Sequence, residues 1–205
     1  VSDSMNHRIQ KFDVNNLDQE GKPIKINDLG SLGFGRGEFR LPQSIDVDDE
    51  GNLYVVDSMN HRIQKFDSEG NFLLSFGSYG TGQGQLLYPF GISVDSKYNL
   101  VYVTDPYQKL QIYSDQGLAL YSFNIQSSGV VSDNNGSFYL GVSKRIIHYR
   151  INDLLDANNN EIIDVFETCF SDGCNGNCAS FCSYGEDLDC GEGCNDGCKK
   201  NCCIG

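Results

Sequence analysis

Residues 156–167 carry oxygen-bearing side chains at the spacing that a bound calcium ion needs. The segment reads DANNNEIIDVFE and lies in an acidic stretch of the chain. Its ligands, at the usual loop positions, would be Asp156, Asn158, Asn160, the backbone carbonyl of Ile162, Asp164 and Glu167. Hard oxygen ligands at this spacing enclose a cation of calcium's size. We therefore predict a calcium site, and the alternative is an Asn-rich linker that binds no metal.

The segment resembles the EF-hand-like loops of secreted bacterial and extracellular proteins, with one departure. Glu161 stands where such loops have a glycine, whose positive φ makes the sharp bend. The resemblance then implies weak binding, with a dissociation constant of about 1 mM or higher. Calcium is the only cofactor that we expect.

A cluster of cysteines follows the acidic segment, whereas residues 1–168 contain none. The nine cysteines are Cys169, Cys174, Cys178, Cys182, Cys190, Cys194, Cys198, Cys202 and Cys203. A short segment with few large apolar residues cannot hold itself together by burial, so disulfide bonds are the expected substitute. A metal cluster and free thiols are the alternatives.

The cysteine spacing repeats within this tail. The string GCNGNCASFC, which begins at Gly173, recurs twenty residues later as GCNDGCKKNC. Two four-cysteine modules result, and their pairing is open because eight cysteines allow many connectivities. Cys203 is left over, and we expect it to be available for a bond to another chain or to a partner cysteine outside residues 1–205.

Asn135-Gly136-Ser137 is the one N-glycosylation sequon of the chain. It falls in an expected turn between two strands, where an acceptor asparagine would be exposed. We predict glycosylation of Asn135 if the chain is secreted.

The elements that position these groups follow from a repeat. The stretch SMNHRIQKFD occurs without a difference at Ser4–Asp13 and at Ser58–Asp67. Around the second copy, apolar and polar residues alternate with the period of β-strands. The four expected strands of this unit are Ser44–Val47, Asn52–Val56, Arg62–Phe66 and Asn71–Phe76. Four strands per unit at this repeat length are typical of a β-propeller blade.

The chain resembles the NHL-repeat family, whose Asn-His-(Leu/Arg) signature appears as Asn6-His7-Arg8 and Asn60-His61-Arg62. The resemblance implies an all-β protein with about 3 to 3.5 blades here, of roughly six in a closed propeller, followed by a small disulfide-rich irregular domain. We divide the chain into blades (1–150), an acidic linker with the calcium-loop-like motif (151–168) and a cysteine-rich module (169–205).

Two complete blades and parts of two others are expected. The second complete blade is predicted at Ile92–Val94, Leu100–Val103, Leu110–Tyr113 and Ala119–Phe123, and the last partial one at Val130–Ser132, Ser137–Leu140 and Ile146–Tyr149. We interpret Asn15–Asp28 as a loop insertion on the edge of one blade. Because an open stack leaves unpaired edges, further blades are expected upstream of Val1 or, alternatively, from a second chain.

The repeated polar residues are assigned to the scaffold. Asp57 and Asn60 suit a tight turn, and His61 and Arg62 are expected to anchor that turn to the neighbouring blade. A catalytic residue is needed once, whereas a scaffold residue is needed in every blade. We therefore predict no catalytic residues in this chain.

Charge and hydropathy exclude two kinds of partner. The net charge is −13; residues 1–150 carry 13 basic and 17 acidic side chains, and residues 151–205 carry 2 and 11. Nucleic acid needs a basic footprint, so we expect no nucleic acid partner. The absence of an 18-residue apolar run argues against a membrane span.

These features together predict an extracellular or secreted structural or interaction module. We expect a subunit of a larger assembly, such as a filament, a surface appendage or a matrix, with other proteins, copies of itself or glycans as partners. The alternative is a secreted enzyme resembling the peptidyl-hydroxyglycine lyases, in which histidines hold a metal. Only His148 is free of the repeat signature, so most of that site would lie in other blades. RNA binding, as in some intracellular NHL proteins, is disfavoured by the acidic charge.

Overall fold

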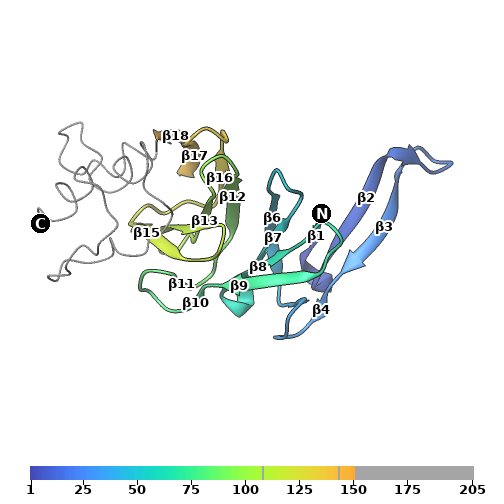
Figure 1. Cartoon of the computed structure of the whole chain (residues 1–205), viewed down its shortest axis with the longest axis horizontal. Coiled ribbons are helices and arrows are strands. Elements are labelled where there is room, and N and C mark those ends of the chain that lie inside the picture. Colours follow the sequence, from blue (N-terminus) through green and yellow to red (C-terminus); the bar gives the residue numbers. More distant parts are fainter. Residues whose placement is uncertain (108, 143, 151–205) are drawn as a thin grey trace, which may run out of the picture. The chain divides into compact units, whose positions relative to one another are not determined.

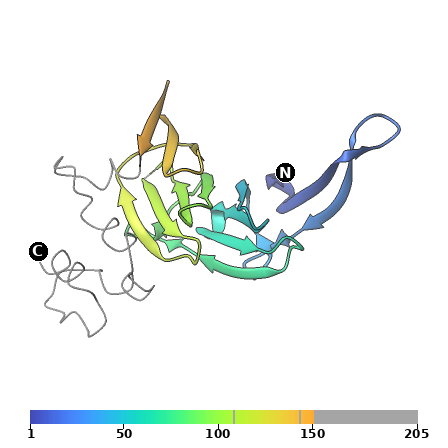
Figure 2. The same cartoon turned by 45° about the horizontal axis from the view of Figure 1, so that its top comes forward.

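The computed structural model of the chain describes residues 1–107, 109–142 and 144–150. Val1–Tyr149 form one compact unit. It consists of four antiparallel sheets that stand side by side (Figures 1 and 2). The prediction of an all-β fold with two complete blades and parts of two more is confirmed.

The two complete sheets have four strands each, in sequence order. The first contains β6 (Pro42–Val47), β7 (Leu53–Asp57), β8 (Arg62–Phe66) and β9 (Phe72–Phe76). The second contains β12 (Gly91–Asp95), β13 (Leu100–Thr104), β14 (Leu110–Ser114) and β15 (Ala119–Phe123). The innermost strands β6 and β12 contact each other, so the blades stack through their inner edges.

Two three-stranded sheets flank the complete ones. The first contains β1 (Ser2–Asp3), β2 (Arg8–Leu17) and β3 (Pro23–Leu29), and the last contains β16 (Val130–Ser132), β17 (Ser137–Val142) and β18 (Arg145–Arg150). The 3₁₀ turns η1 (Ser4–Asn6) and η2 (Ser58–Asn60) lie in the repeated stretch. Short parallel pairs form in the connections between blades: β4 (Ser31–Leu32) with β5 (Glu38–Phe39), and β10 (Ser78–Tyr79) with β11 (Gln85–Leu86).

Four of the hairpin turns share one chemistry, an aspartate followed three residues later by glycine. In the turn between β8 and β9, the Asp67 carboxylate accepts hydrogen bonds from the backbone N–H groups of Glu69 and Asn71, at 3.0 and 2.7 Å. Gly70 adopts a φ of +90°, which a side chain would strain. The same arrangement closes the turn of Asp48 and Gly51. Local turn chemistry thus sets where each strand ends.

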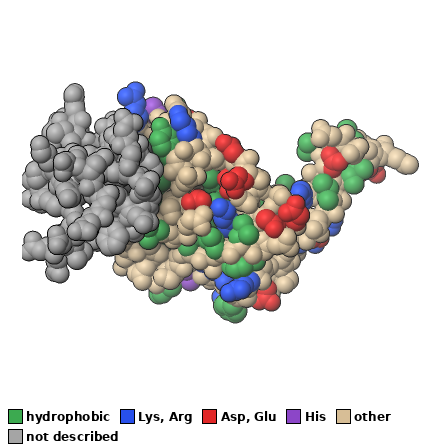
Figure 3. Space-filling view, viewed as in Figure 1, with side chains coloured by type: hydrophobic (Ala, Val, Ile, Leu, Met, Phe, Trp, Pro, Cys, Tyr) green, Lys and Arg blue, Asp and Glu red, His purple; other side chains and the backbone are tan. Residues whose placement is uncertain are grey.

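The interpretation of Asn15–Asp28 as a loop insertion is wrong. Strands β2 and β3 continue as a two-stranded ribbon that projects from its blade, with exposed hydrophobic side chains on it (Figures 1 and 3). Asp18 and Gly21 close it with the same turn chemistry, since the Asp18 carboxylate accepts from the N–H groups of Glu20 and Lys22. The extra residues therefore lengthen a hairpin, whose register shifts between Lys11 and Phe12 and between Asp13 and Leu17.

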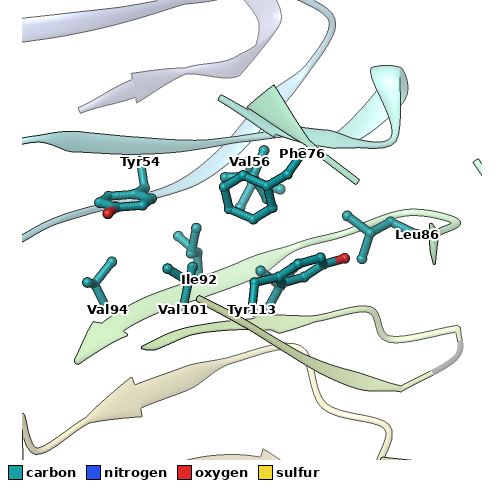
Figure 4. Close-up of a cluster of buried hydrophobic side chains, with 10 residues drawn as sticks. Tyr54, Val56, Phe76, Leu86, Ile92, Val94, Val101 and Tyr113 are labelled. Carbon is teal, nitrogen blue, oxygen red and sulfur yellow. The ribbon is translucent and has the colours of Figure 1, made fainter. Parts of the chain in front are cut away.

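The core between the two complete blades is a layer of interdigitated apolar side chains (Figure 4). Its buried members are Tyr54, Val56, Ile63, Phe76, Leu86, Ile92, Val94, Val101, Val103 and Tyr113. Leu86 comes from the connection between the blades, so the connection itself is part of the core. Each large apolar side chain buried here contributes about 1.5–3 kcal/mol to stability.

The repeated phenylalanine occupies two different environments. Phe66 is fully buried and packs edge-on against Phe39 and Phe72, with ring centroids 5.8 and 6.0 Å apart. Phe12, at the same place in the identical stretch SMNHRIQKFD, is 36% exposed. Phe66 is thus covered by Phe39 of the connection that precedes its blade, whereas no such ring lies over Phe12 among the described residues.

This difference predicts unequal mutational costs. Phe66→Ala should lower the free energy of unfolding by about 3–5 kcal/mol, because it leaves a cavity in a packed interface. Phe12→Ala should cost about 1 kcal/mol or less, because much of that ring is already in water. Urea denaturation of both variants measures the difference, and equal losses would contradict this account of the packing.

Candidate functional site

A buried carboxylate organises the junction between the first two blades. Asp57, at the end of β7, is 0% exposed. Its two oxygens accept hydrogen bonds from Arg40 N at 2.7 Å, Asn60 Nδ2 at 2.9 Å, Arg62 Nε at 2.8 Å and Gln64 Nε2 at 3.0 Å. Such a charge is stable in the interior only because every acceptor site is used.

The partners of Asp57 hold the glycine-rich connection between the blades. Gln64 donates to the carbonyl of Glu38 at 2.8 Å and accepts from the N–H of Gly37 at 3.0 Å. Arg62 donates through Nη2 to the carbonyls of Gly35 and Glu38. The connection therefore gains from side chains the hydrogen bonds that a regular strand would give it.

The next junction repeats this plan. Asp105, 1% exposed, accepts through Oδ2 from the backbone N–H groups of Leu87 and Tyr88, at 2.7 and 2.8 Å. Gln111 donates to the carbonyl of Gln85 at 2.8 Å, in the manner of Gln64. Lys109 replaces Arg62 and donates to the carbonyl of Thr81. The same arrangement of hydrogen bonds therefore forms with lysine at one junction and arginine at the other.

The two signature histidines belong to this scaffold. His7 and His61 both adopt left-handed φ, +55° and +56°, and end the 3₁₀ turns η1 and η2. His7 Nδ1 accepts from the N–H of Leu41 at 3.1 Å, and His61 Nδ1 lies against the carbonyl of Leu87. Each ring thus binds the backbone that leads into the next blade. The predicted anchoring role of His61 and Arg62 is confirmed.

Exposed tyrosines surround His61 on the face formed by these turns and connections. The His61 ring centroid lies 4.8 Å from that of Tyr79 and 5.8 Å from that of Tyr88, and Tyr107 follows at 5.6 Å from Tyr88. All three contacts are edge-on. Tyr79 and Tyr107 are 67% and 72% exposed, and Tyr88 is 44% exposed. We call His61, Tyr79, Tyr88 and Tyr107 the tyrosine row.

The backbone fixes two of these tyrosines through one carboxylate. Asp105 accepts from Tyr88 N through Oδ2 and from Tyr107 N, at 3.1 Å, through Oδ1. Tyr79 belongs to β10 and pairs with Leu86 of β11, which is buried in the core. The exposed rings therefore stand on a rigid support, which is the arrangement of a preorganised binding surface.

A second charged cluster links the complete blades away from this face. Lys65 of β8, whose side chain is 6% exposed, lies 3.7 Å from Asp48 and 3.9 Å from Asp115 of the following blade. Burial by itself would raise the pKa of Asp48, but hydrogen bonds from Asn52 and the charge of Lys65 hold that pKa below its ordinary value. Burial, with Asp48 nearby, raises the pKa of Tyr54 far above its ordinary value. This cluster is a structural link between blades.

Most of the sequence-predicted site residues lie outside the described residues. This holds for the six calcium ligands, Asp156, Asn158, Asn160, Ile162, Asp164 and Glu167, and for all nine cysteines between Cys169 and Cys203. Calcium binding and disulfide formation stay predictions. Within the described part of the chain, no three His, Cys, Asp or Glu side chains gather where they could hold a metal ion.

Two other predicted positions are described. Asn135 is exposed in the turn that leads into β17, and its N–H donates to the Asp133 carboxylate at 2.8 Å. Its glycosylation stays a prediction. His148 stacks on Tyr139 of the same sheet with ring centroids 4.7 Å apart. The three histidines thus lie in three different sheets or turns and form no common site among the described residues.

Comparison with known proteins identifies the repeat. The family model "NHL repeat" matches residues 39–66, which run from β5 to the end of β8. Three curated relatives match short stretches: the B-box type zinc finger protein ncl-1 of Caenorhabditis elegans (43% identity over 44 residues), Protein lin-41 of the same organism (40% over 58) and Protein brain tumor of Drosophila melanogaster (40% over 48). These stretches cover 22%, 28% and 23% of this chain and 5% of each relative.

A solved structure shows the same fold. A chain of the nidogen/laminin complex superposes with a TM-score of 0.51 and 15% identity, over 71% of this chain and 55% of that one. The predicted family resemblance and the propeller fold are therefore confirmed.

The predicted function is contradicted by these relatives. They are a B-box type zinc finger protein, Protein lin-41 and Protein brain tumor, and none of these names describes an extracellular structural module or a secreted enzyme. The filament, appendage or matrix subunit and the lyase alternative are both withdrawn. The prediction failed because it gave the cysteine tail more weight than the blades. An extracellular location rests on those cysteines alone and stays a prediction.

The Asp57 network predicts a large mutational effect. Asp57→Ala should lower the free energy of unfolding by about 3–5 kcal/mol, because the Arg62 charge and three further donors lose their buried acceptor. Asp3→Ala removes the same repeat residue where it is partly exposed, and should cost much less, because water screens and replaces its contacts. Urea titrations of the two variants measure the difference. If Asp57→Ala lowered the free energy of unfolding as little as Asp3→Ala does, this role of Asp57 would be contradicted.

The Lys65 cluster predicts a pH effect. Since the pKa of Asp48 is lowered on folding, its stabilising contribution is present above about pH 4 and is lost as the pH falls through the folded value. Lys65→Met should therefore destabilise the protein at pH 7, and the difference from the native chain should shrink below pH 4. Denaturant titrations between pH 3 and 7 measure it. A constant difference over that range would show that the pair does not act as described.

Proposed function

Because the chain carries an NHL repeat within a set of β-propeller blades, we propose that its described part is a non-catalytic docking platform for other proteins. Propeller folds generally serve protein interactions, and the curated relatives are regulatory NHL proteins. The docking surface is the face formed by η2, the turn between β13 and β14, and the connections between blades. No helix among the described residues is both long and apolar enough to cross a membrane.

The observation that carries this proposal is the exposed tyrosine row. Tyrosine and histidine rings supply large contact areas with few rotatable bonds, and aromatic residues are enriched at the centres of protein interfaces. A single exposed ring needs no explanation, but Tyr79 and Tyr88 contact His61 edge-on and Tyr107 contacts Tyr88, so the rings form a continuous patch. Their rigid support lowers the entropy lost on binding.

The titratable groups beneath this face support a non-catalytic role. The carboxylate oxygens of Asp57 and Asp105 accept hydrogen bonds from backbone and side-chain donors. His61 uses Nδ1 on the backbone carbonyl of Leu87. A general base needs an oxygen or nitrogen open to a substrate. The two carboxylates instead satisfy the scaffold, which supports a role in binding for this face.

The proposal predicts that partner binding depends on the tyrosine row. Replacing both Tyr79 and Tyr107 by alanine should reduce the recovery of the specific partners at least about 10-fold, because aromatic anchors dominate interface energies. Quantitative co-purification from cells that express the chain measures it. The control is Tyr98→Ala, a 48% exposed tyrosine at the opposite end of β13.

Unchanged recovery with the double variant would overturn the proposed face. Equal losses with Tyr98→Ala would show that binding uses the opposite side of the blades. Circular dichroism and urea denaturation should give the same stability for native chain and variants, since none of the three rings is buried.

A further inference from the structure

Each described junction joins two different faces of neighbouring blades. We call the side of a blade that meets the following blade its forward face, and the side that meets the preceding blade its back face. In the core between the complete blades, Tyr54 and Ile63 come from a forward face, and Val101 and Tyr113 come from the back face of the next blade. A forward face therefore always packs against a back face, and the contact is heterologous.

The forward face of the last blade repeats this apolar pattern but is exposed. The second strand of three blades carries a tyrosine: Tyr54 and Tyr102 are fully buried, whereas Tyr139 is 41% exposed. The second residue of β8, Ile63, is 0% exposed, whereas the second residue of β18, Ile146, is 78% exposed. Side chains that are buried at the other junctions thus lie open to solvent here.

One position on this face lacks a polar link that the other blades have. Asp46 accepts through Oδ2 from the backbone N–H of Val94 in the next blade, at 2.7 Å, and Ser93 accepts in the same way from Ser132 N, at 2.8 Å. Both acceptors stand opposite the tyrosine of their blade in the sheet. In the last blade that position holds Val131, which is 63% exposed. The last blade therefore presents an apolar side chain where the others bind a following strand.

The back face of the first blade is exposed as well. Phe66 and Tyr113 are buried at their junctions, but Phe12, at the same place in the repeat, is 36% exposed. Beside it lies a recess of about 620 Å³, lined by Phe12, Asp18, Lys22, Pro23, Ile24 and Lys25. The ribbon of β2 and β3 adds further exposed apolar side chains, Val14, Leu17, Ile24 and Ile26. This face offers a partly apolar surface with room for side chains of another molecule.

The first blade satisfies its polar groups without an incoming connection. Arg62 and Gln64 donate to backbone carbonyls of the connection that precedes their blade. Their equivalents in the identical stretch, Arg8 and Gln10, donate instead to the carboxylate of Asp28, at 3.0 and 3.4 Å. Asp28 stands opposite Gln10 in the sheet, where the complete blade has a serine. An apolar surface that brings no connection is therefore enough to cover this face.

We propose that these two faces bind each other between two copies of this chain, the forward face of the last blade in one copy against the back face of the first blade in the other. The two faces lie at opposite ends of the stack of sheets (Figures 1 and 2). Ile146 then covers Phe12, in the way that Ile9 and Phe66 share one buried cluster at the first junction. The contact repeats the blade packing already present within each copy.

Closure and charge both favour a second copy as the occupant. Two such contacts close a ring of eight sheets, two times the four of one chain, and propellers close with about 4 to 8 blades. Residues 137–150, at the forward face, carry three basic and no acidic side chains. Residues 13–28, on the ribbon, carry four acidic and two basic side chains. The opposite net charges attract where the two faces meet.

Sedimentation velocity of the full chain tests the proposal, with reductant present so that cysteine cross-links do not contribute. The native chain should sediment as a dimer. Ile146→Asp and Phe12→Asp should each raise the dissociation constant at least about 10-fold, because each places an unpaired carboxylate in an apolar contact. The matched control is Leu118→Asp, at a 61% exposed position between β14 and β15, which should dimerise like the native chain.

A mixture of the two variants distinguishes this head-to-tail contact from a symmetric one. The Phe12→Asp chain keeps its forward face and the Ile146→Asp chain keeps its back face, so the mixture should form heterodimers although each variant alone is monomeric. A mixture that stays monomeric, or a variant that dimerises like the native chain, would overturn the proposal. A monomeric native chain would also overturn it and would leave both faces to other proteins.

This contact is separate from the tyrosine row. Replacing both Tyr79 and Tyr107 by alanine should leave the dimer unchanged, because neither side chain lies on the two end faces. Loss of the dimer in that variant would contradict the assignment of the contact to the end faces. The docking face and the contact between copies can therefore fail independently of each other.

Discussion

The burial of one carboxylate at each of the first two junctions between blades is the constraint on which this part of the structure depends. Asp57 and Asp105 are withdrawn from water at the end of a second strand, where each must find donors for its lone pairs. For both, some of those donors are backbone amides of the connection between blades; Asp57 also accepts from the following strand. A connection rich in glycine, with little side-chain packing of its own, thereby becomes as fixed as the sheets that it joins.

The side chains that hold the junctions together are therefore distinct from those that are exposed on the surface. Gln64 and Gln111 hold equivalent carbonyls at successive junctions, and the layer of apolar side chains fills the space beneath. Because these interactions are complete within the scaffold, exposed positions such as Leu32 and Tyr79 are free to differ without a cost to folding. In a repeat architecture, one junction can in this way carry a binding surface while the neighbouring junction carries none.

The sequence predicted the blades well and the functional face poorly, for physical reasons. Identity of the repeated stretch and period-2 alternation report directly on strand pairing, so the complete blades were found. The ribbon at Asn15–Asp28 was missed although the turn chemistry of Asp18 and Gly21 was present. The tyrosine row was missed because its members are distant in the sequence. Aligning the two junctions, Leu32 with Tyr79, is the signal that could have revealed it.

Native-state hydrogen exchange at the connections tests the central claim most directly. The amides of Gly37 and Arg40 donate to Gln64 and Asp57 rather than to any strand. If the buried carboxylate holds the connection, these amides should exchange only with opening free energies close to those of β7 in the same sheet. Exchange near the rate of an unstructured peptide, with β7 still protected, would show that the connection opens independently and would contradict the account.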